Sequence, residues 1–564
     1  MGESVSKPTM GTPRWAARIR RSDGEIVGSG ILLSPDRVLT CAHVVREGEP
    51  VTAEFVGAEG VDVPSVTAHV IDGMYKPEEL DADLDPIGDV ALLSLDTPRP
   101  ADEAVQLHRL SSPGRPVRMY GFPEAHNGGI WLPATVLGGC GRDGQVQLTP
   151  LGPGLLASPG FSGGGVVDTE TGEVVGMVLS KSEARHGSGF TFMSPAETIV
   201  QHLEDVADWT TGLEAVDVRL RSGASDADEA LLDTLFAERL ATWFRDDGRQ
   251  VKISLVPDGD SARAATLRRA ITLADRELRT WASTRRASLD PPGTVPSAGG
   301  HDLAVVADGL TAAEAADLIA NRLGLWKPPD APAIDRIRAA KATLTLVVVG
   351  VDKAAEPDRL LDLLALLRTR GSRLLLVFGE AGAHFRRAQS ELVIEPTQRQ
   401  HDALVALLDE ITGPLASALR QRMAAVHSDT AKRALSALVR AYAIQQELAG
   451  THGFVAGLGQ NHDLGVFGES AARSADRIRS AIGTHDELVA RRDELRGRLA
   501  AYGDLYQAEA DHEDLDMADR YLAAHQLLRA RPCDVPAAEA AVLHYIRSVE
   551  EPDASPAQEG EPPR

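Results

Sequence analysis

Three short stretches, far apart in the chain, constrain its fold more than any other feature. They are LTCAHVV around His43, GDVALL around Asp89 and SPGFSGGG around Ser162. Each holds one side chain of a Ser-His-Asp hydrolase, and each lies beside an apolar or glycine-rich run. A serine nucleophile needs a base, and the base needs a group that orients it. The three stretches therefore predict one catalytic site built on β-strands.

The context of each stretch indicates strands. Residues 14–205 are predicted to be all-β, because short apolar or alternating runs recur between Gly, Pro and Asp residues. His43 follows the strand-like run RVLT, and Asp89 leads directly into VALLSL. The competing carboxylates upstream lie in a polar run that is typical of a solvated loop: Asp81, Asp83 and Asp85. Asp89 is therefore the predicted partner of His43.

The glycines around Ser162 have a chemical explanation. A nucleophilic serine on a tight turn needs neighbours that can adopt a positive φ, which glycine allows. The backbone amides of Gly160 and Ser162 can then converge on a developing oxyanion. Taken alone, this motif could be an ordinary glycine-rich turn, and His43 alone could be a buried core histidine.

Together, GSGILLSPDRVLTCAH, GFSGGG and the following VVDTETGEVVGMVLS resemble the trypsin-like (chymotrypsin-fold) serine peptidases, most closely the bacterial branch without disulfides. The order His43, Asp89, Ser162 belongs to the same arrangement. The resemblance implies a double β-barrel over 14–210. In that fold the three side chains are the catalytic triad, and the amides of Gly160 and Ser162 form the oxyanion hole.

Departures from the family refine the expectation. Phe161 stands where secreted digestive members carry an aspartate that pairs with a new N-terminus, so classical zymogen activation is not expected. Leu156 takes the place of an acid at the floor of the specificity pocket, and Gly189 and Phe190 are expected to supply another wall. We therefore expect a preference for substrates with a small or medium apolar P1 residue. Cys41 has no cysteine placed to bridge it and is interpreted as a small buried hydrophobe.

Beyond the barrel region the pattern changes. A helix is expected to close that region, with Ser194 as N-cap and Pro195 at the first helical position. Strands and helices then alternate over 211–398, which predicts an α/β domain with a mainly parallel sheet, beginning with a strand at AVDVRLR. The run TLTLVVVGVD, ending at Asp352, resembles a strand of a degenerate P-loop NTPase. The chain has no GxxxxGK[ST] motif after VKISLVP, so no phosphate cradle is predicted.

The last part of the chain is predicted to be helical. Strand-like runs stop near 399, and 399–549 is expected to form an all-α bundle. It resembles the helical accessory modules of bacterial signalling proteins, which implies a regulatory protein partner. Residues 1–13 are expected to be a flexible tail, and 550–564 a disordered acidic tail.

Composition excludes several classes. The net charge of −24 and an aromatic content of 4% argue against binding to nucleic acids or membrane surfaces. We find no apolar run that predicts a signal peptide or membrane span. Three cysteines are too few for a disulfide framework. A cytoplasmic, bacterial protein is predicted, with neither cofactor nor metal.

These observations lead to one main hypothesis. The chain is predicted to be an intracellular serine endopeptidase that cleaves a protein or peptide substrate and is regulated or targeted by its C-terminal domains. Such fusions look like effector proteases of bacterial conflict or stress systems. The alternative is a latent protease-fold scaffold that binds proteins without cleaving them.

Overall fold

In the computed structural model the chain divides into two compact units, Met1–Ile394 and Glu395–Arg564. We describe each unit by itself. The structure describes residues 11–551 except for short stretches, which are 61, 81–85, 110–112, 125, 141–143, 152–158, 180–190, 222–232, 246–247, 280–282, 284–286, 288, 327, 451–460 and 510–513. The predicted acidic tail thus lies almost wholly outside the described residues.

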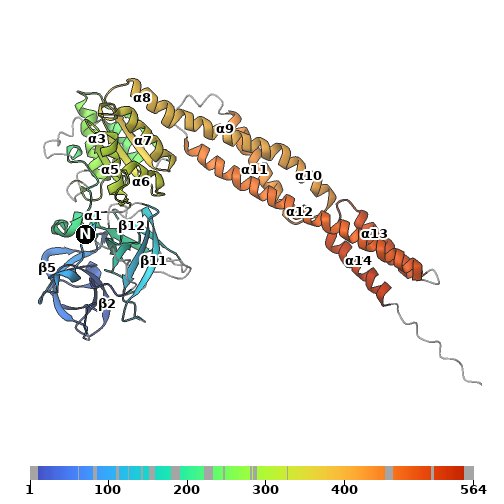
Figure 1. Ribbon diagram of the computed structural model, residues 1–564, viewed down its shortest axis with the longest axis horizontal. Helices are drawn as coiled ribbons and strands as arrows, with labels where there is room; N and C mark the ends of the chain where they lie inside the picture. Colours follow the sequence, from blue (N-terminus) through green and yellow to red (C-terminus); the bar gives the residue numbers. More distant parts are fainter. Residues whose placement is uncertain are drawn as a thin grey trace, which may run out of the picture. The chain divides into compact units, whose positions relative to one another are not determined.

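The first unit begins with a closed six-stranded barrel (Figure 1). Antiparallel pairing between β1 and β4, the two ends of the strand order given below, closes the barrel. Apolar side chains such as Ile19, Leu39 and Leu92 fill its interior and are at most 1% exposed. In order around the barrel, the strands are β1 (Ala16–Arg20), β2 (Ile26–Ser34), β3 (Arg37–Thr40), β8 (Val90–Leu95), β5 (Ser65–Lys76) and β4 (Val51–Glu54).

A second barrel follows, closed by the pairing of β13 with β14. Alternation explains its longest strand, β11, in which Leu132, Ala134 and Val136 are buried while their neighbours are more exposed. Its six strands are β10 (Pro116–Gly121), β11 (Ile130–Gly139), β12 (Val146–Pro150), β15 (Thr191–Pro195), β14 (Val174–Val178) and β13 (Gly165–Asp168). Two short strands, β9 (Leu107–His108) and β16 (Thr210–Thr211), extend this sheet. The predicted double β-barrel is confirmed.

The helix that follows the second barrel starts later than predicted. Helix α1 spans Ala196–His202. Ser194 and Pro195 belong to β15, where they pair with Met177 and Gly176 of β14. The prediction of Ser194 as the N-cap was therefore wrong, because closure of the barrel extends the strand through both residues.

A four-stranded, entirely parallel sheet forms the rest of the first unit, in the order β17 (Val251–Leu255), β20 (Arg373–Phe378), β19 (Thr345–Val349), β18 (Leu303–Val306). One face packs on α2 (Thr234–Phe244) and α3 (Ser261–Ala274). The other packs on α5 (Ala312–Arg322), α6 (Ala333–Ala339) and α7 (Pro357–Thr369) (Figure 1). The predicted α/β architecture is confirmed.

One predicted strand of this region is wrong. AVDVRLR forms only a single bridge, between Val216 and Ala304. The chain then turns into a short 3-10 helix, η4 (Val218–Leu220), because the Asp217 carboxylate caps it by accepting from the Arg219 amide at 2.9 Å.

The second unit is helical, as predicted. Its apolar side chains form two clusters, one shared by α9 to α11 and the first part of α12, the other by the last part of α12 with α13 and α14. No helix among the described residues is long and apolar enough to cross a membrane. The helices are α9 (Glu395–Glu410), α10 (Ala416–Ala425), α11 (Thr430–Gly450), α12 (Asn461–Glu509), α13 (Leu515–Arg529) and α14 (Val535–Glu550). Helix α8 (Ala383–Ala388) precedes them at the end of the first unit.

Two buried arginines join the second barrel to the α/β sheet and its helices. Arg322, at the end of α5, donates to Glu197 of α1 at 2.8 Å, and both side chains are 2% exposed. Arg115 donates to Asp168 Oδ2 at 2.6 Å and to the carbonyl of Leu323 at 3.0 Å. A buried guanidinium needs such partners because an unpaired charge is costly away from water. These bonds make the two parts of the first unit depend on each other.

We expect Arg322→Ala to lower the free energy of unfolding of the full-length protein by about 3–5 kcal/mol, since it leaves the buried Glu197 carboxylate without its cation. Urea unfolding measures the change. Arg338→Ala is the matched control, because it breaks an exposed pair with Asp335 and should cost about 1 kcal/mol or less. Equal losses for the two variants would contradict the role given to the buried pair.

Candidate active site

The first barrel brings His43 and Asp89 together. His43 lies in the short turn Ala42–Val44 after β3, and Asp89 lies directly before β8, which pairs with β3. His43 Nδ1 lies 2.9 Å from Asp89 Oδ2, and the His43 backbone amide donates to Asp89 Oδ1 at 3.0 Å. The carboxylate therefore fixes both the ring and the backbone of His43.

Their environments differ sharply. The Asp89 side chain is 2% exposed and that of His43 is 42% exposed. Burial lowers the pKa of His43, but the hydrogen bond and charge of Asp89, together with the charge of Glu78, raise it more, so the pKa lies above its ordinary value of 6.5. A buried carboxylate behind a solvent-facing imidazole is suited to stabilise an imidazolium at the surface.

Asp89 is held in an unusual backbone conformation. Its φ of 66° is the one positive value for a residue other than glycine among the described residues, and Gly88 before it has a φ of 83°. A left-handed conformation costs about 1–2 kcal/mol for such a residue. The surrounding barrel offsets this cost, and the conformation places the carboxylate against the backbone amide and the ring Nδ1 of His43.

Ser162 lies on the turn that precedes β13, and Ser29 of β2 holds this turn from the other barrel. The Ser29 amide donates to the Ser162 carbonyl at 2.8 Å, and Ser29 Oγ donates to the Gly160 carbonyl at 2.7 Å. Thr40 Oγ1 in turn donates to the Ser29 carbonyl at 2.7 Å. The turn of the second barrel that carries Ser162 is therefore fixed by a strand of the first.

Glycine is required on this turn for two reasons. Gly160 and Gly163 have φ values of 101° and 86°. A side chain at either position would also collide with backbone atoms, those of Phe122 at Gly160 and those of Ser29 at Gly163. Phe161 between them is 2% exposed and belongs to the core of the second barrel.

Two amides of the turn are left open. Gly160 N–H and Ser162 N–H donate to no protein acceptor within the described chain, although both residues are buried. Unpaired buried amides are rare and usually have an explanation. Donors at these positions are suited to bind an oxyanion.

Backbone contacts bring the turns of His43 and Ser162 to one place. A Cβ built on Gly28 would lie 2.6 Å from the Val44 side chain and 2.9 Å from the Ser162 carbonyl, so residues of both turns flank this glycine. The Val178 carbonyl accepts from Gly163 N at 2.9 Å and from Cys41 Sγ at 3.3 Å. Within the described residues, however, Ser162 Oγ makes no hydrogen bond to His43.

Cys41 lies close to the His43–Asp89 pair. The ligand atoms of Cys41, His43 and Asp89 all lie within 4.8 Å of one another. Burial, followed by the charge of Asp89, raises the pKa of the Cys41 thiol well above its ordinary value, so the thiol stays protonated and is a poor metal ligand. Cys41 is a free, buried cysteine, which agrees with the sequence interpretation.

Some predicted residues lie outside the described part of the chain. They are the three specificity-pocket residues Leu156, Gly189 and Phe190. The apolar P1 preference therefore stays a prediction. Conversely, the sequence argument missed Ser29 and Thr40. Nothing in their local pattern distinguishes them from other strand residues, because their partners are more than ten residues away along the chain.

Comparisons with known proteins found a family model and several solved structures that resemble this chain. Residues 28–177 match the family model of the trypsin-like peptidase domain. The inactive form of Rv3671c from M. tuberculosis H37Rv aligns at 24% identity over 35% of this chain and 88% of that chain, with a TM-score of 0.26. The MamO protease domain from Magnetospirillum magneticum aligns at 19% identity over 34% of this chain and 97% of that chain, with a TM-score of 0.25. No curated protein matches the chain.

The His43–Asp89 contact leads to a prediction about the pKa of His43. We expect Asp89→Asn to lower the pKa of His43, because the bond and charge that raise it are weakened or lost while burial remains. NMR of the imidazole in full-length protein measures the shift. Neutral His43 is the proton acceptor, so a reaction that uses it should speed up as the pH rises through this pKa. An unchanged pKa in Asp89→Asn would contradict the arrangement.

The bonds of Ser29 predict a second effect. Ser29→Ala removes the donor to Gly160 and loosens the nucleophile turn, so we expect about tenfold slower reaction of Ser162 with a fluorophosphonate probe. Ser34→Ala is the matched control on the same strand, since among the described residues the Ser34 hydroxyl bonds the side chain of Asp36 alone, at 2.9 Å. Labelling of Ser29→Ala at the rate of the control would show that the bond has no positioning role.

Proposed function

Because residues 28–177 form a trypsin-like peptidase domain, we propose that the chain is a serine endopeptidase whose triad is Ser162, His43 and Asp89. The observation that carries this proposal is the 2.9 Å contact between His43 Nδ1 and the buried Asp89 carboxylate. That contact leaves Nε2, the nitrogen that accepts a proton in such enzymes, as the free acceptor of a neutral ring.

The proposed mechanism uses each group once in each half of the reaction. Ser162 Oγ attacks the peptide carbonyl while His43 Nε2 takes its proton. The Gly160 and Ser162 amides bind the oxyanion of the tetrahedral intermediate. His43 then gives the proton to the leaving amine, and water hydrolyses the acyl-enzyme by the reverse sequence. Asp89 keeps the proton on Nδ1 and stabilises the imidazolium throughout.

Buried Phe161 supports activation without N-terminal cleavage. It occupies the core of the second barrel, where an aspartate of the digestive enzymes would need a charged partner. We therefore propose that the site matures on folding. Regulation falls to the rest of the chain, and the buried Arg322–Glu197 pair offers a physical link between the two parts of the first unit.

The finer parts of the proposal rest on the sequence. They are an apolar P1 residue, a cytoplasmic location, a protein substrate, a regulatory partner for the C-terminal domains, and a role as effector protease in a bacterial conflict or stress system. The free state of all three cysteines is compatible with a reducing compartment.

One observation favours the alternative, a latent protease fold that binds proteins. The Ser162 hydroxyl lacks a hydrogen bond to His43 among the described residues. Catalytic hydrogen bonds are often long in enzymes without substrate and tighten in the complex, so this geometry alone does not decide between the two.

A fluorophosphonate probe decides between them. We expect the full-length protein to be labelled at Ser162, full-length Ser162→Ala to remain unlabelled, and Asp89→Asn to react roughly 10³–10⁴ times more slowly. Ser428→Ala, which changes a serine of the second unit, controls for labelling elsewhere and should behave as the unchanged protein does. Absence of labelling in folded full-length protein would favour the latent scaffold.

A further inference from the structure

The α/β sheet carries a pocket at the edge where all four of its strands end. Its volume is about 400 Å³, within the range of small-molecule sites. Val256, Val306, Val349 and Phe378 line it, and each is the last residue of its strand or follows it directly. The carboxyl edge of a parallel sheet is where ligands bind in open α/β folds.

The chain topology explains why a pocket forms here. The segment after β17 leads to α3 on one face of the sheet, and the segments after β18 and β19 lead to helices on the other face. After β20 the chain enters α8, whose Phe385 packs with α5, α6 and α7. The segments that follow the neighbouring strands β17 and β20 therefore lie on opposite faces of the sheet. The pocket takes residues from both diverging segments, 256–261 and 377–379.

Cations from three elements reach this pocket: Arg219 of η4, Arg268 of α3 and Lys353 beyond β19. Only two carboxylates line it, Asp258 and Asp260. Two of these cations are held by carboxylates, Arg219 by Asp217 and Lys353 by Asp258. Arg219 is oriented by bonds to Asp217 at 2.8 Å and to the Val306 carbonyl at 3.0 Å.

The other residues that line the pocket offer an apolar surface and a hydrogen-bond acceptor. Val256, Val306 and Val349 are partly exposed and form an apolar floor for a ring. Asp258 pairs with Lys353 and is itself 80% exposed, so its carboxylate can also accept from hydroxyl groups. Gly259, with a φ of 96°, has no atom within 4 Å of a built Cβ, which leaves this side of the pocket open.

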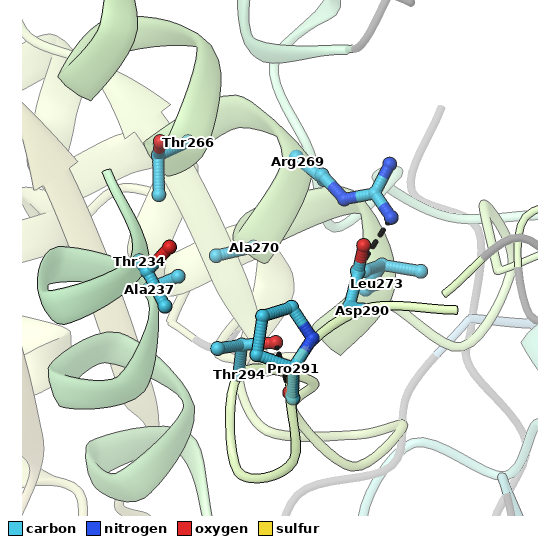
Figure 2. A pocket seen from close by; sticks show the side chains of 9 residues that line it. All are labelled: Thr234, Ala237, Thr266, Arg269, Ala270, Leu273, Asp290, Pro291 and Thr294. Atoms are coloured by element: carbon cyan, nitrogen blue, oxygen red, sulfur yellow. Dashed lines mark hydrogen bonds and ion pairs between the residues drawn. The ribbon is translucent and has the colours of Figure 1, made fainter. Parts of the chain in front are cut away.

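A second cavity on α3 shows the contrast. Arg269, the next residue after Arg268, faces a space of only about 30 Å³ and pairs with Asp290 at 2.6 Å (Figure 2). That space suits one water molecule. The two adjacent arginines thus serve different sites, and Arg269 serves as a control for Arg268.

We propose that the pocket at the carboxyl edge of the sheet binds a small phosphorylated organic molecule, a nucleoside phosphate or a sugar phosphate. The phosphate would lie on Arg268, Lys353 and Arg219, the sugar hydroxyls would meet Asp258, and the ring or carbon skeleton would cover the three valines. This site is independent of the peptidase chemistry, and it uses none of the residues of a P-loop.

Calorimetric titration of the full-length protein tests the proposal. The probes are the four nucleoside 5′-monophosphates, glucose 6-phosphate, the unphosphorylated nucleosides, glucose and inorganic phosphate. We expect one of the organic phosphates to bind and its unphosphorylated parent to bind at least tenfold more weakly. The class that binds separates nucleoside from sugar phosphates. Binding of none of these organic phosphates, or equally tight binding of inorganic phosphate, would overturn the proposal.

Variants locate the site. Arg268→Gln and Lys353→Gln should each weaken binding about tenfold or more, since each removes a charge-assisted bond, while Arg269→Gln should leave it within about twofold. Ser261→Glu guards against misfolding as an explanation. It adds a negative charge at the exposed first residue of α3, which favours the helix but repels a phosphate. If Arg268→Gln and Ser261→Glu both bind the ligand as tightly as the unchanged protein does, the ligand lies elsewhere and the proposal is overturned.

Discussion

The hydrogen bonds of Ser29 to the Ser162 turn hold together the two halves of the candidate site. The first barrel supplies His43 and Asp89, and the second supplies Ser162 and the open amides of Gly160 and Ser162. Neither barrel contains a complete site. Ser29 contributes an amide and a hydroxyl to the turn from β2, and Thr40 fixes Ser29 from β3. A site divided in this way depends on the register between two separately closed sheets, which a few buried bonds to backbone carbonyls define.

The buried Asp89 carboxylate is the second constraint. It is surrounded by barrel core, adopts a left-handed backbone conformation and accepts from both the backbone and the ring of His43. A charge in such a place is stable only where hydrogen bonds replace its hydration. The side-chain hydrogen bond that Asp89 accepts in the core also raises the pKa of His43, so a requirement of stability and a property needed for general base catalysis have one origin.

Buried charged side chains join the barrels to the α/β sheet of the first unit. Arg322 and Arg115 are each at most 3% exposed, and each donates a hydrogen bond across the junction. Arg322 ends α5, one of the helices that pack on the sheet. The Arg322–Glu197 pair thus connects a helix of the α/β part to α1 beside the second barrel.

The sequence by itself determined most of the strands and helices and the choice of Asp89 as the partner of His43. Alternation in runs such as IWLPATVLGG specifies a barrel strand, the continuous apolar runs LAVV and TLVVV specify a buried parallel sheet, and Asp89 could be chosen over its neighbours because it alone adjoins a buried strand. Ser194 and AVDVRLR were misjudged because barrel closure and an aspartate cap override local propensity there. Only the tertiary structure decided the rest. Ser29, the open amides, the Arg322–Glu197 pair and the pocket at the sheet edge all arise from residues distant in the chain, whose proximity depends on strand register and packing rather than on any local pattern.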